Sequence, residues 1–152
     1  VHIHKKFDAA IISNGGAPKD CNLFQSVKGL HNGLFAMNDG SSVVLCAECF
    51  NGFGPEGYRL GFECGSYEEL WEKQAYERYD PEMAISLLTM RYLTHMKVYL
   101  ISGLSDEEVR KAGMIPVKTP EEAGALIKAD KPELKELMVL PCGALTCPIV
   151  EE

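Results

Sequence analysis

The chain has 152 residues, of which 46% are hydrophobic and 24% are charged, and its formal net charge at pH 7 is −7. This composition is typical of an ordinary globular domain and excludes a disordered or membrane-spanning chain. An acidic balance without a Lys/Arg cluster argues against nucleic acid as a partner. We expect one domain over residues 1–152, no membrane partner, and a cytoplasmic location because no signal-peptide pattern opens the chain.

The first 34 residues predict a strand, a turn and a helix. Phe7–Ile12 is apolar and partly β-branched, as a strand covered on both faces requires. Residues 14–18 hold two glycines and a proline, which stop regular structure, and either Asp20 or Asn22 can then cap a helix. The apolar side chains that recur along this helix, and that we expect in the core, are Leu23, Val27, Leu30 and Leu34.

The opposite face of the same helix carries Asn22, Gln25 and Lys28, each three residues apart. An amide and an ammonium one turn apart, near a helix start that favours negative charge, can bind a carboxylate or a phosphate. The alternative interpretation is that Gln25 and Lys28 are simply the solvated face of an amphipathic helix.

A second apolar strand follows from Val43, and after it comes a glycine-rich loop, Phe50–Gly61. Four glycines and a proline in this segment allow either the close approach of a ligand, or a mobile lid, or a plain long connection. Tyr67–Tyr79 then reads as a helix whose expected buried residues are Leu70, Trp71 and Tyr76.

A further helix is expected from Asp80 and Pro81 to about His95. Its apolar residues at spacings of three and four are Ile85, Leu88 and Tyr92.

From Lys97 onward short strands and helices alternate. The strands expected are Val98–Ile101, Ile115–Val117 and Leu137–Leu140. Ser105 and Glu108 form a capping box for a helix to Ala112, and Thr119, Pro120 and Glu122 begin one to about Ala129. This order predicts a three-layer α/β fold, with a mostly parallel sheet of about five strands and helices on both faces.

Ligands of such sheets bind at the carboxyl ends of the strands. Three segments are expected to emerge there together: the Asn14–Asp20 turn, the Cys49–Gly57 loop and the Pro141–Thr146 turn. The residues in or directly beside these segments that could face a cleft or a cofactor are Asn14, Gly15, Gly16, Asp20, Glu48, Gly52 and Gly54.

Six cysteines are scattered through the chain, as is usual for reduced thiols. Cys46 and Cys49 form a C-x-x-C, so a thiol redox protein is one alternative function, although a redox cysteine normally sits at a helix N-terminus. A metal site that combines this pair with Cys142 and Cys147 has an unusual ligand spacing, and we expect no metal in this chain. None of His2, His4, His31 and His95 is expected to be catalytic.

Three motifs resemble one known family. SNGG-x-P-x-D-x-N-L-F-Q-x-V-K-G at Ser13–Gly29 is similar to the segment that opens the C-terminal domain of the nickel-dependent lactate racemases. VVLCAECFNGFG at Val43–Gly54 resembles the family's strand ending in Ala-Glu-Cys and its glycine-rich loop. LMVLPCGALTCPIV at Leu137–Val150 resembles the family's last strand and its Pro-x-Gly turn.

The resemblance implies an isomerase that racemises or epimerises a 2-hydroxy acid by hydride transfer to a nickel pincer nucleotide. The cofactor and the catalytic residues would belong mainly to an N-terminal domain that this chain lacks, so we expect no catalytic residue and no cofactor in this chain, and no activity of the isolated domain. Its partners would be that domain and the small 2-hydroxy acid.

The glutamine and lysine of the family motif, which hold the substrate carboxylate, fall on Gln25 and Lys28. Phe24 stands where the family usually has tyrosine, which favours a larger or more apolar C2 substituent. The other alternative is a stand-alone, non-catalytic binder of small carboxylates. The reading frame upstream of this chain would distinguish such a binder from a racemase.

Overall fold

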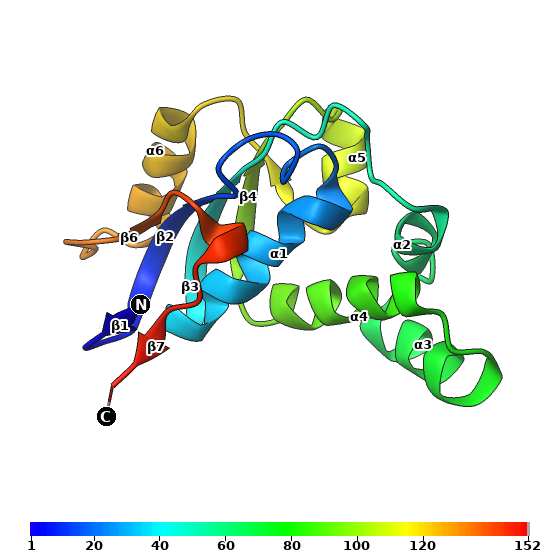
Figure 1. Ribbon diagram of the computed structural model, residues 1–152. Coiled ribbons are helices and arrows are strands. Elements are labelled where there is room, and N and C mark those ends of the chain that lie inside the picture. The colour runs from blue at the N-terminus through cyan, green and yellow to red at the C-terminus, as the bar shows by residue number, and fades with distance from the viewer. Residues whose placement is uncertain (152) are drawn as a thin grey trace.

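Five parallel strands form the central sheet of the computed structural model, which describes residues 1–151 (Figure 1). Their spatial order is β5-β4-β3-β2-β6. The strands are β2 (Phe7–Ser13), β3 (Met37–Cys46), β4 (Lys97–Ile101), β5 (Ile115–Pro116) and β6 (Met138–Leu140). In the register of the central pair Ile12 lies beside Leu45. The predicted α/β class and the parallel sheet of about five strands are confirmed.

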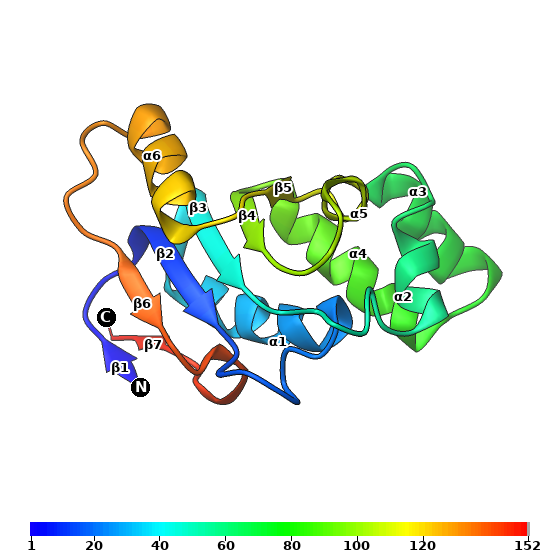
Figure 2. The same ribbon diagram turned by 90° about the horizontal axis from the view of Figure 1, so that it is seen from above.

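Helices cover both faces of this sheet, so the fold has three layers (Figures 1 and 2). The alternation of side chains along β2 divides the core: Ala10 and Ile12 pack on one face, whereas Ala9 and Ile11 pack on the other. The first face is covered by α1 (Leu23–Gly33), α2 (Glu56–Gly61), α4 (Pro81–Leu93) and α5 (Asp106–Lys111). Of the helices in the described residues, only α6 (Pro120–Asp130) contributes to the second core cluster, through Ala123 and Ile127.

The helix α1 begins after the second of its two candidate caps. Asn22 is the N-cap, and its side chain accepts a hydrogen bond from the backbone N–H of Gln25. All four residues expected in the core are buried: Leu23, Val27, Leu30 and Leu34. Complete burial of one leucine stabilises the fold by roughly 1.5–3 kcal/mol. The 3₁₀ turn η1 (Leu34–Ala36) then leads into β3.

The glycine-rich segment is shorter than expected, because Glu56–Gly61 forms α2. This helix packs closely on α4: Ser86 Oγ donates to the carbonyl of Tyr58 at 2.6 Å, and a Cβ on Gly61 would lie 2.4 Å from Ser86 Cβ. The small residues therefore serve helix packing. The same contact explains why Met83, Ser86 and Thr89 are the buried residues of α4, whereas the periodically spaced Ile85, Leu88 and Tyr92 are half-buried.

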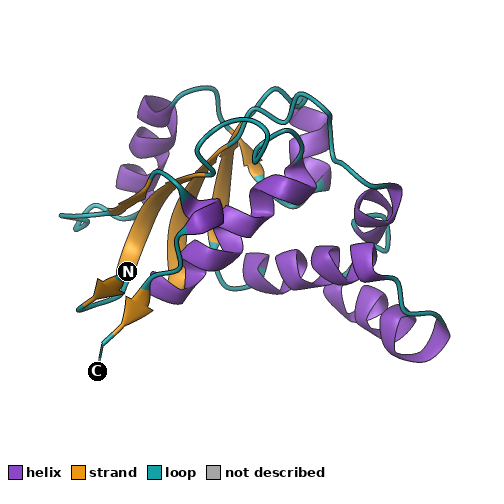
Figure 3. Ribbon diagram, in the orientation of Figure 1, coloured by secondary structure: helices purple, strands orange, loops and turns teal. Residues whose placement is uncertain are grey.

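The helix expected over residues 67–79 is interrupted. It consists of α3 (Tyr67–Glu72) and a π-helical turn, Lys73–Glu77. Leu70 is buried as expected, but the side chains of Trp71 and Tyr76 are 52% and 83% exposed, so their predicted burial is wrong. The reason is their position: α3 lies at the outer end of α4, away from the sheet (Figures 1 and 3).

The C-terminal half follows the prediction closely. The capping box of Ser105 and Glu108 opens α5, and Thr119 caps α6. Two short strands are additional: β1 (His2–Ile3) pairs in parallel with β7 (Ile149–Val150). The 3₁₀ turn η3 (Gly143–Leu145) precedes β7 and packs on α1. None of the helices in residues 1–151 has the length and apolar character to cross a membrane.

Candidate functional site

The loops after β2, β3 and β4 border a shallow hollow of about 390 Å³ at the carboxyl edge of the sheet. Its lining includes Ser13, Gly16, Asp20, Cys46, Glu48 and Ser102. The structure thus brings together three of the residues expected at this edge, Gly16, Asp20 and Glu48. No Lys, Arg or His lines the hollow, so its electrostatic character is acidic.

Asp20 joins the first two of these loops. Its Oδ2 accepts a hydrogen bond from the backbone N–H of Glu48 at 3.3 Å, and its carbonyl accepts one from Cys49 N at 2.8 Å. Oδ1 is buried and has no hydrogen-bond partner within residues 1–151. Cys49 itself adopts a positive φ of 55°, which turns the chain at this junction.

The start of α1 is closed by the loop after β3. The backbone N–H groups of Leu23 and Phe24 donate to the carbonyls of Gly52 and Phe53, each at 3.0 Å. The N–H of Gln25 donates to Asn22 Oδ1 at 2.9 Å. These are the donors that a helix N-terminus offers to an anion. Because they are already used, the expected contribution of the helix start to anion binding is absent, and side chains must supply it.

Gln25 and Lys28 lie together on the outer face of α1. Lys28 Nζ donates to Gln25 Oε1 at 2.5 Å, and the lysine side chain is exposed. Neither residue lines the hollow at the edge of the sheet. The structure therefore shows two separate surfaces: an acidic hollow at the loops, and an amide–ammonium pair on the helix.

Phe24 is half-buried on the flank of the same helix. Its ring meets Tyr58 edge to face, with centroids 5.3 Å apart and an interplanar angle of 72°. Gly54 lies against it with φ +102°, and a Cβ there would be 2.9 Å from Phe24 Cβ. Tyr58, which sequence reasoning missed, is completely buried and contacts the rings of Phe53 and Phe62 as well. The burial of Tyr58 is not apparent from the sequence, because residues 50–61 are expected to form a loop.

In the turn after β2, the two glycines and Asn14 lie in different surroundings. Gly15 and Gly16 have positive φ values of 88° and 83°, and Gly15 approaches Cys142 of the β6–η3 turn. Asn14 is 1% exposed and does not line the hollow; its Nδ2 donates to the carbonyls of Lys19 and Gln25. The turns after β2 and β6 are therefore neighbours, as expected for the carboxyl edge.

The surroundings of the C-x-x-C pair disfavour the reactive thiolate form of both cysteines. Burial raises the pKa of the Cys46 thiol, and burial raises the pKa of Cys49 to about 11, although a hydrogen bond with Ser26 opposes the shift. A reactive cysteine needs a lowered pKa. All six cysteines are free. Within residues 1–151, no three His, Cys, Asp or Glu side chains come together as a metal site.

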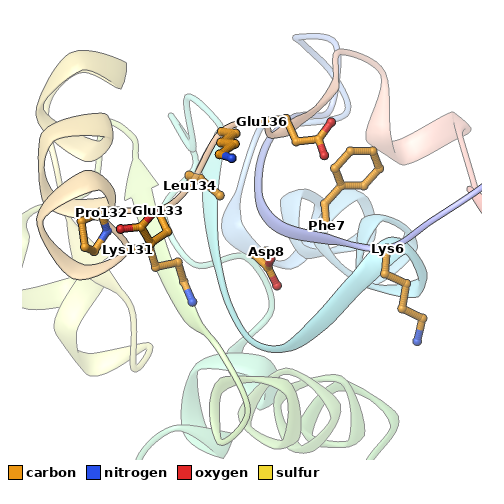
Figure 4. Close-up of a pocket in the computed structure, with 9 residues that line it drawn as sticks. Lys6, Phe7, Asp8, Lys131, Pro132, Glu133, Leu134 and Glu136 are labelled. Atoms are coloured by element: carbon orange, nitrogen blue, oxygen red, sulfur yellow. The ribbon is translucent and has the colours of Figure 1, made fainter.

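Another hollow, of about 460 Å³, lies at the other end of the sheet (Figure 4). Its charged lining residues balance one another: Lys6, Lys131 and Lys135 against Asp8, Glu133 and Glu136. With no net charge, and with these side chains mostly exposed, it offers no recognition chemistry comparable to that of the opposite edge.

The fold and the placement of its loops define a parallel α/β domain whose variable segments gather at the carboxyl edge of the sheet. Residues 3–146 match the family described as the Lactate racemase C-terminal domain. The chain belongs to this family.

Two curated relatives are lactate racemases. The one from Thermoanaerobacterium thermosaccharolyticum is 32% identical over 144 residues, which cover 91% of this chain and 34% of the relative. The one from Lactiplantibacillus plantarum is 27% identical over 141 residues, which cover 90% and 33%. The chain thus spans about a third of the length of the curated relatives it matches.

Two solved structures are also similar. The lactate racemase apoprotein from T. thermosaccharolyticum matches 98% of this chain and 36% of its own, with a TM-score of 0.85 and 30% identity. A crystal structure of a protein from Thermotoga maritima matches 99% of this chain and 39% of its own, with a TM-score of 0.63. At 15% identity the latter supports the fold alone.

Proposed function

We propose that this chain is the C-terminal domain of a larger isomerase that racemises or epimerises a 2-hydroxy acid, and that it holds the substrate carboxylate. The proposal is supported by membership of the lactate racemase C-terminal domain family and by the names of the curated relatives. Since those relatives are about three times as long as the matched region, a second domain would supply the rest of the active site.

The observation that carries the proposal is the contact between Lys28 Nζ and Gln25 Oε1 on the open face of α1. An ammonium has three N–H donors, and the contact uses one of them. Two donors of Lys28 and the two of the Gln25 amide are left, enough to bind both oxygens of a carboxylate. The carboxylate would be fixed while the other two substituents of C2, the hydroxyl and the side group, exchange places.

The affinity of this pair for a carboxylate is low while the pair faces water, because exposed ionic contacts contribute little free energy. A second domain that closes over α1 would exclude water and strengthen the same contacts. The proposal therefore accounts for an exposed pair in the isolated domain, which would bind its ligand too weakly to act alone.

Phe24 would form the apolar wall beside the carboxylate, since it precedes Lys28 by one helical turn and is fixed against Tyr58. Without the tyrosine hydroxyl usual in the family, it favours a larger or more apolar C2 substituent than that of lactate. The residues of the neighbouring loops that would face the second domain are Gly15, Gly16, Asp20, Glu48, Gly52 and Gly54, whereas the buried Asn14 would support them from the interior.

By its resemblance to the family, the complete enzyme would use a nickel pincer nucleotide for hydride chemistry, held by residues outside this chain. The described residues offer no ligand set for its metal, so they do not fit a nickel centre and no step is assigned to nickel from this domain. The part of this chain is confined to binding and orienting the acid, and no residue of it is assigned as catalytic.

The test is Lys28→Ala in the complete, cofactor-loaded enzyme, assayed against D- and L-2-hydroxy acids. We expect KM to rise and kcat to fall, so that kcat/KM drops at least about tenfold, or about 1.4 kcal/mol. Lys6→Ala is the matched control, an exposed lysine at the far end of the sheet (Figure 4).

Wild-type turnover in Lys28→Ala would refute the role of this residue. A complete protein that binds 2-hydroxy acids in calorimetry without racemising any of them would favour the non-catalytic binder instead.

A further inference from the structure

Asn14 connects the turn after β2 to the helix that displays Gln25 and Lys28. Its amide nitrogen donates two hydrogen bonds, to the carbonyl of Lys19 at 2.9 Å and to that of Gln25 at 3.1 Å. The side chain is 1% exposed, so it is part of the interior. One buried amide thus ties the end of the central strand to the first turn of α1.

Gly29 provides the space in which this amide lies. A Cβ at position 29 would fall 1.9 Å from Asn14 Oδ1, a distance at which a methyl group cannot exist beside it. Oδ1 is buried and has no conventional hydrogen-bond donor within residues 1–151. It lies over the Cα of Gly29, where a weak Cα–H···O contact is the interaction available to it.

These contacts fix α1 on both sides of Lys28. Asn14 holds the carbonyl of Gln25 and excludes any side chain from Gly29, and one turn later Asn32 Nδ2 donates to the carbonyl of Gly143 at 2.8 Å. The rotation of α1 about its own axis decides where the side chains of Gln25 and Lys28 point. Asn14 acts on that rotation from inside the fold.

We infer that Asn14 is a positioning residue for the carboxylate pair, acting through the Gln25 carbonyl and the close approach of Gly29. This inference rests on the proposed function. It assigns Asn14 no contact with substrate: its effect is to set the angle at which α1 presents Lys28.

The geometry is tested first in this chain without substrate. Gly29→Ala should increase the unfolding equilibrium constant at least about tenfold, because the new methyl group meets Asn14 Oδ1. In an Asn14→Ala background the same substitution should be neutral or stabilising, since alanine is the better helix former and the obstructing oxygen is gone. Urea titrations of the four proteins measure this coupling. An equal penalty in both backgrounds would overturn the assigned contact.

The positioning role is tested in the complete, cofactor-loaded enzyme with Asn14→Asp, which keeps the shape but loses both donors, and with Asn14→Ala. Each should raise KM and lower kcat at least about threefold, as a misplaced Lys28 would. In a Lys28→Ala background, Asn14→Asp and Asn14→Ala should cause little further loss in kcat/KM, because both positions act on the same contact with the carboxylate. A structural role alone predicts losses that multiply, and that result would refute the inference. If Lys28→Ala itself has no effect while the stability coupling holds, the proposed function fails and the contact stands.

Discussion

The imidazole Nε2 of His31 lies 3.3 Å from Oγ1 of Thr89, so this ring bridges α1 and α4. The Thr89 hydroxyl donates to the carbonyl of Ile85 at 2.8 Å, and toward His31 it can therefore only accept. The proton of the neutral ring belongs on Nε2 in this arrangement. The ring also packs on Tyr92, with centroids 5.3 Å apart.

This contact predicts a pH-dependent stability. Burial lowers the pKa of His31 from 6.5 to about 4. As the pH falls through that window, the unfolded chain binds a proton that the folded chain does not, so the free energy of unfolding decreases by at most about 3 kcal/mol. Well above pH 6.5 both states are neutral here and the contribution of His31 is constant.

Urea denaturation at about pH 7 and about pH 5 measures the effect. His31→Gln should remove part of the pH dependence, whereas His95→Gln, at an exposed histidine, should keep it. A His31→Gln protein with the wild-type pH slope would contradict the assignment.

The thiols should react in an order set by burial. Cys142 and Cys147 are exposed and should be alkylated by iodoacetamide first. Cys49 is buried with a pKa of about 11, so at pH 8 on the order of one molecule in a thousand carries its thiolate, and we expect labelling only after denaturation. Peptide mass spectrometry over time distinguishes the sites. Rapid alkylation of native Cys49 would revive the redox interpretation.

Gly54 should tolerate no side chain. Gly54→Ala combines a φ of +102° with a Cβ 2.9 Å from Phe24 Cβ, and we expect a loss of roughly 1–3 kcal/mol in the free energy of unfolding. Gly124→Ala is the matched control, because Gly124 lies in α6 with no atom within 4 Å of the new Cβ. Alanine there should stabilise the chain by about 0.5–1 kcal/mol. Equal effects at the two positions, by urea denaturation, would contradict this account of the loop.

The elements predictable from sequence are those whose determinants lie within the element. Asn22 marks the start of α1 and the capping box of Ser105 and Glu108 marks that of α5, and both act within one turn. Trp71 shows the limit of this reasoning: periodicity identifies an apolar face but not whether another element covers it. The helix α2 escaped prediction because it contains Gly61, which is needed for contact with Ser86, a residue 25 positions further along the chain.

The same distinction applies to the candidate site. The pairing of Gln25 with Lys28 follows from their spacing on a helix. The closure of the helix start by Gly52 and Phe53 does not, since those residues lie almost 30 positions downstream and reach α1 only in the folded chain. The inward orientation of Asn14 likewise depends on the space left by Gly29, a relationship visible only in three dimensions.

The carbonyls of Gly52 and Phe53 occupy the N–H groups at the first turn of α1, and this affects how the ligand preference of the fold can change in evolution. A loop that binds phosphate through backbone N–H groups owes its charge preference to the main chain, so few single substitutions change that preference. In this domain, under the proposed function, charge preference resides in two side chains on the outside of a helix. One codon change could therefore redirect selectivity toward a neutral or cationic metabolite while leaving the interior untouched, which makes the fold readily adaptable to new acids and their analogues.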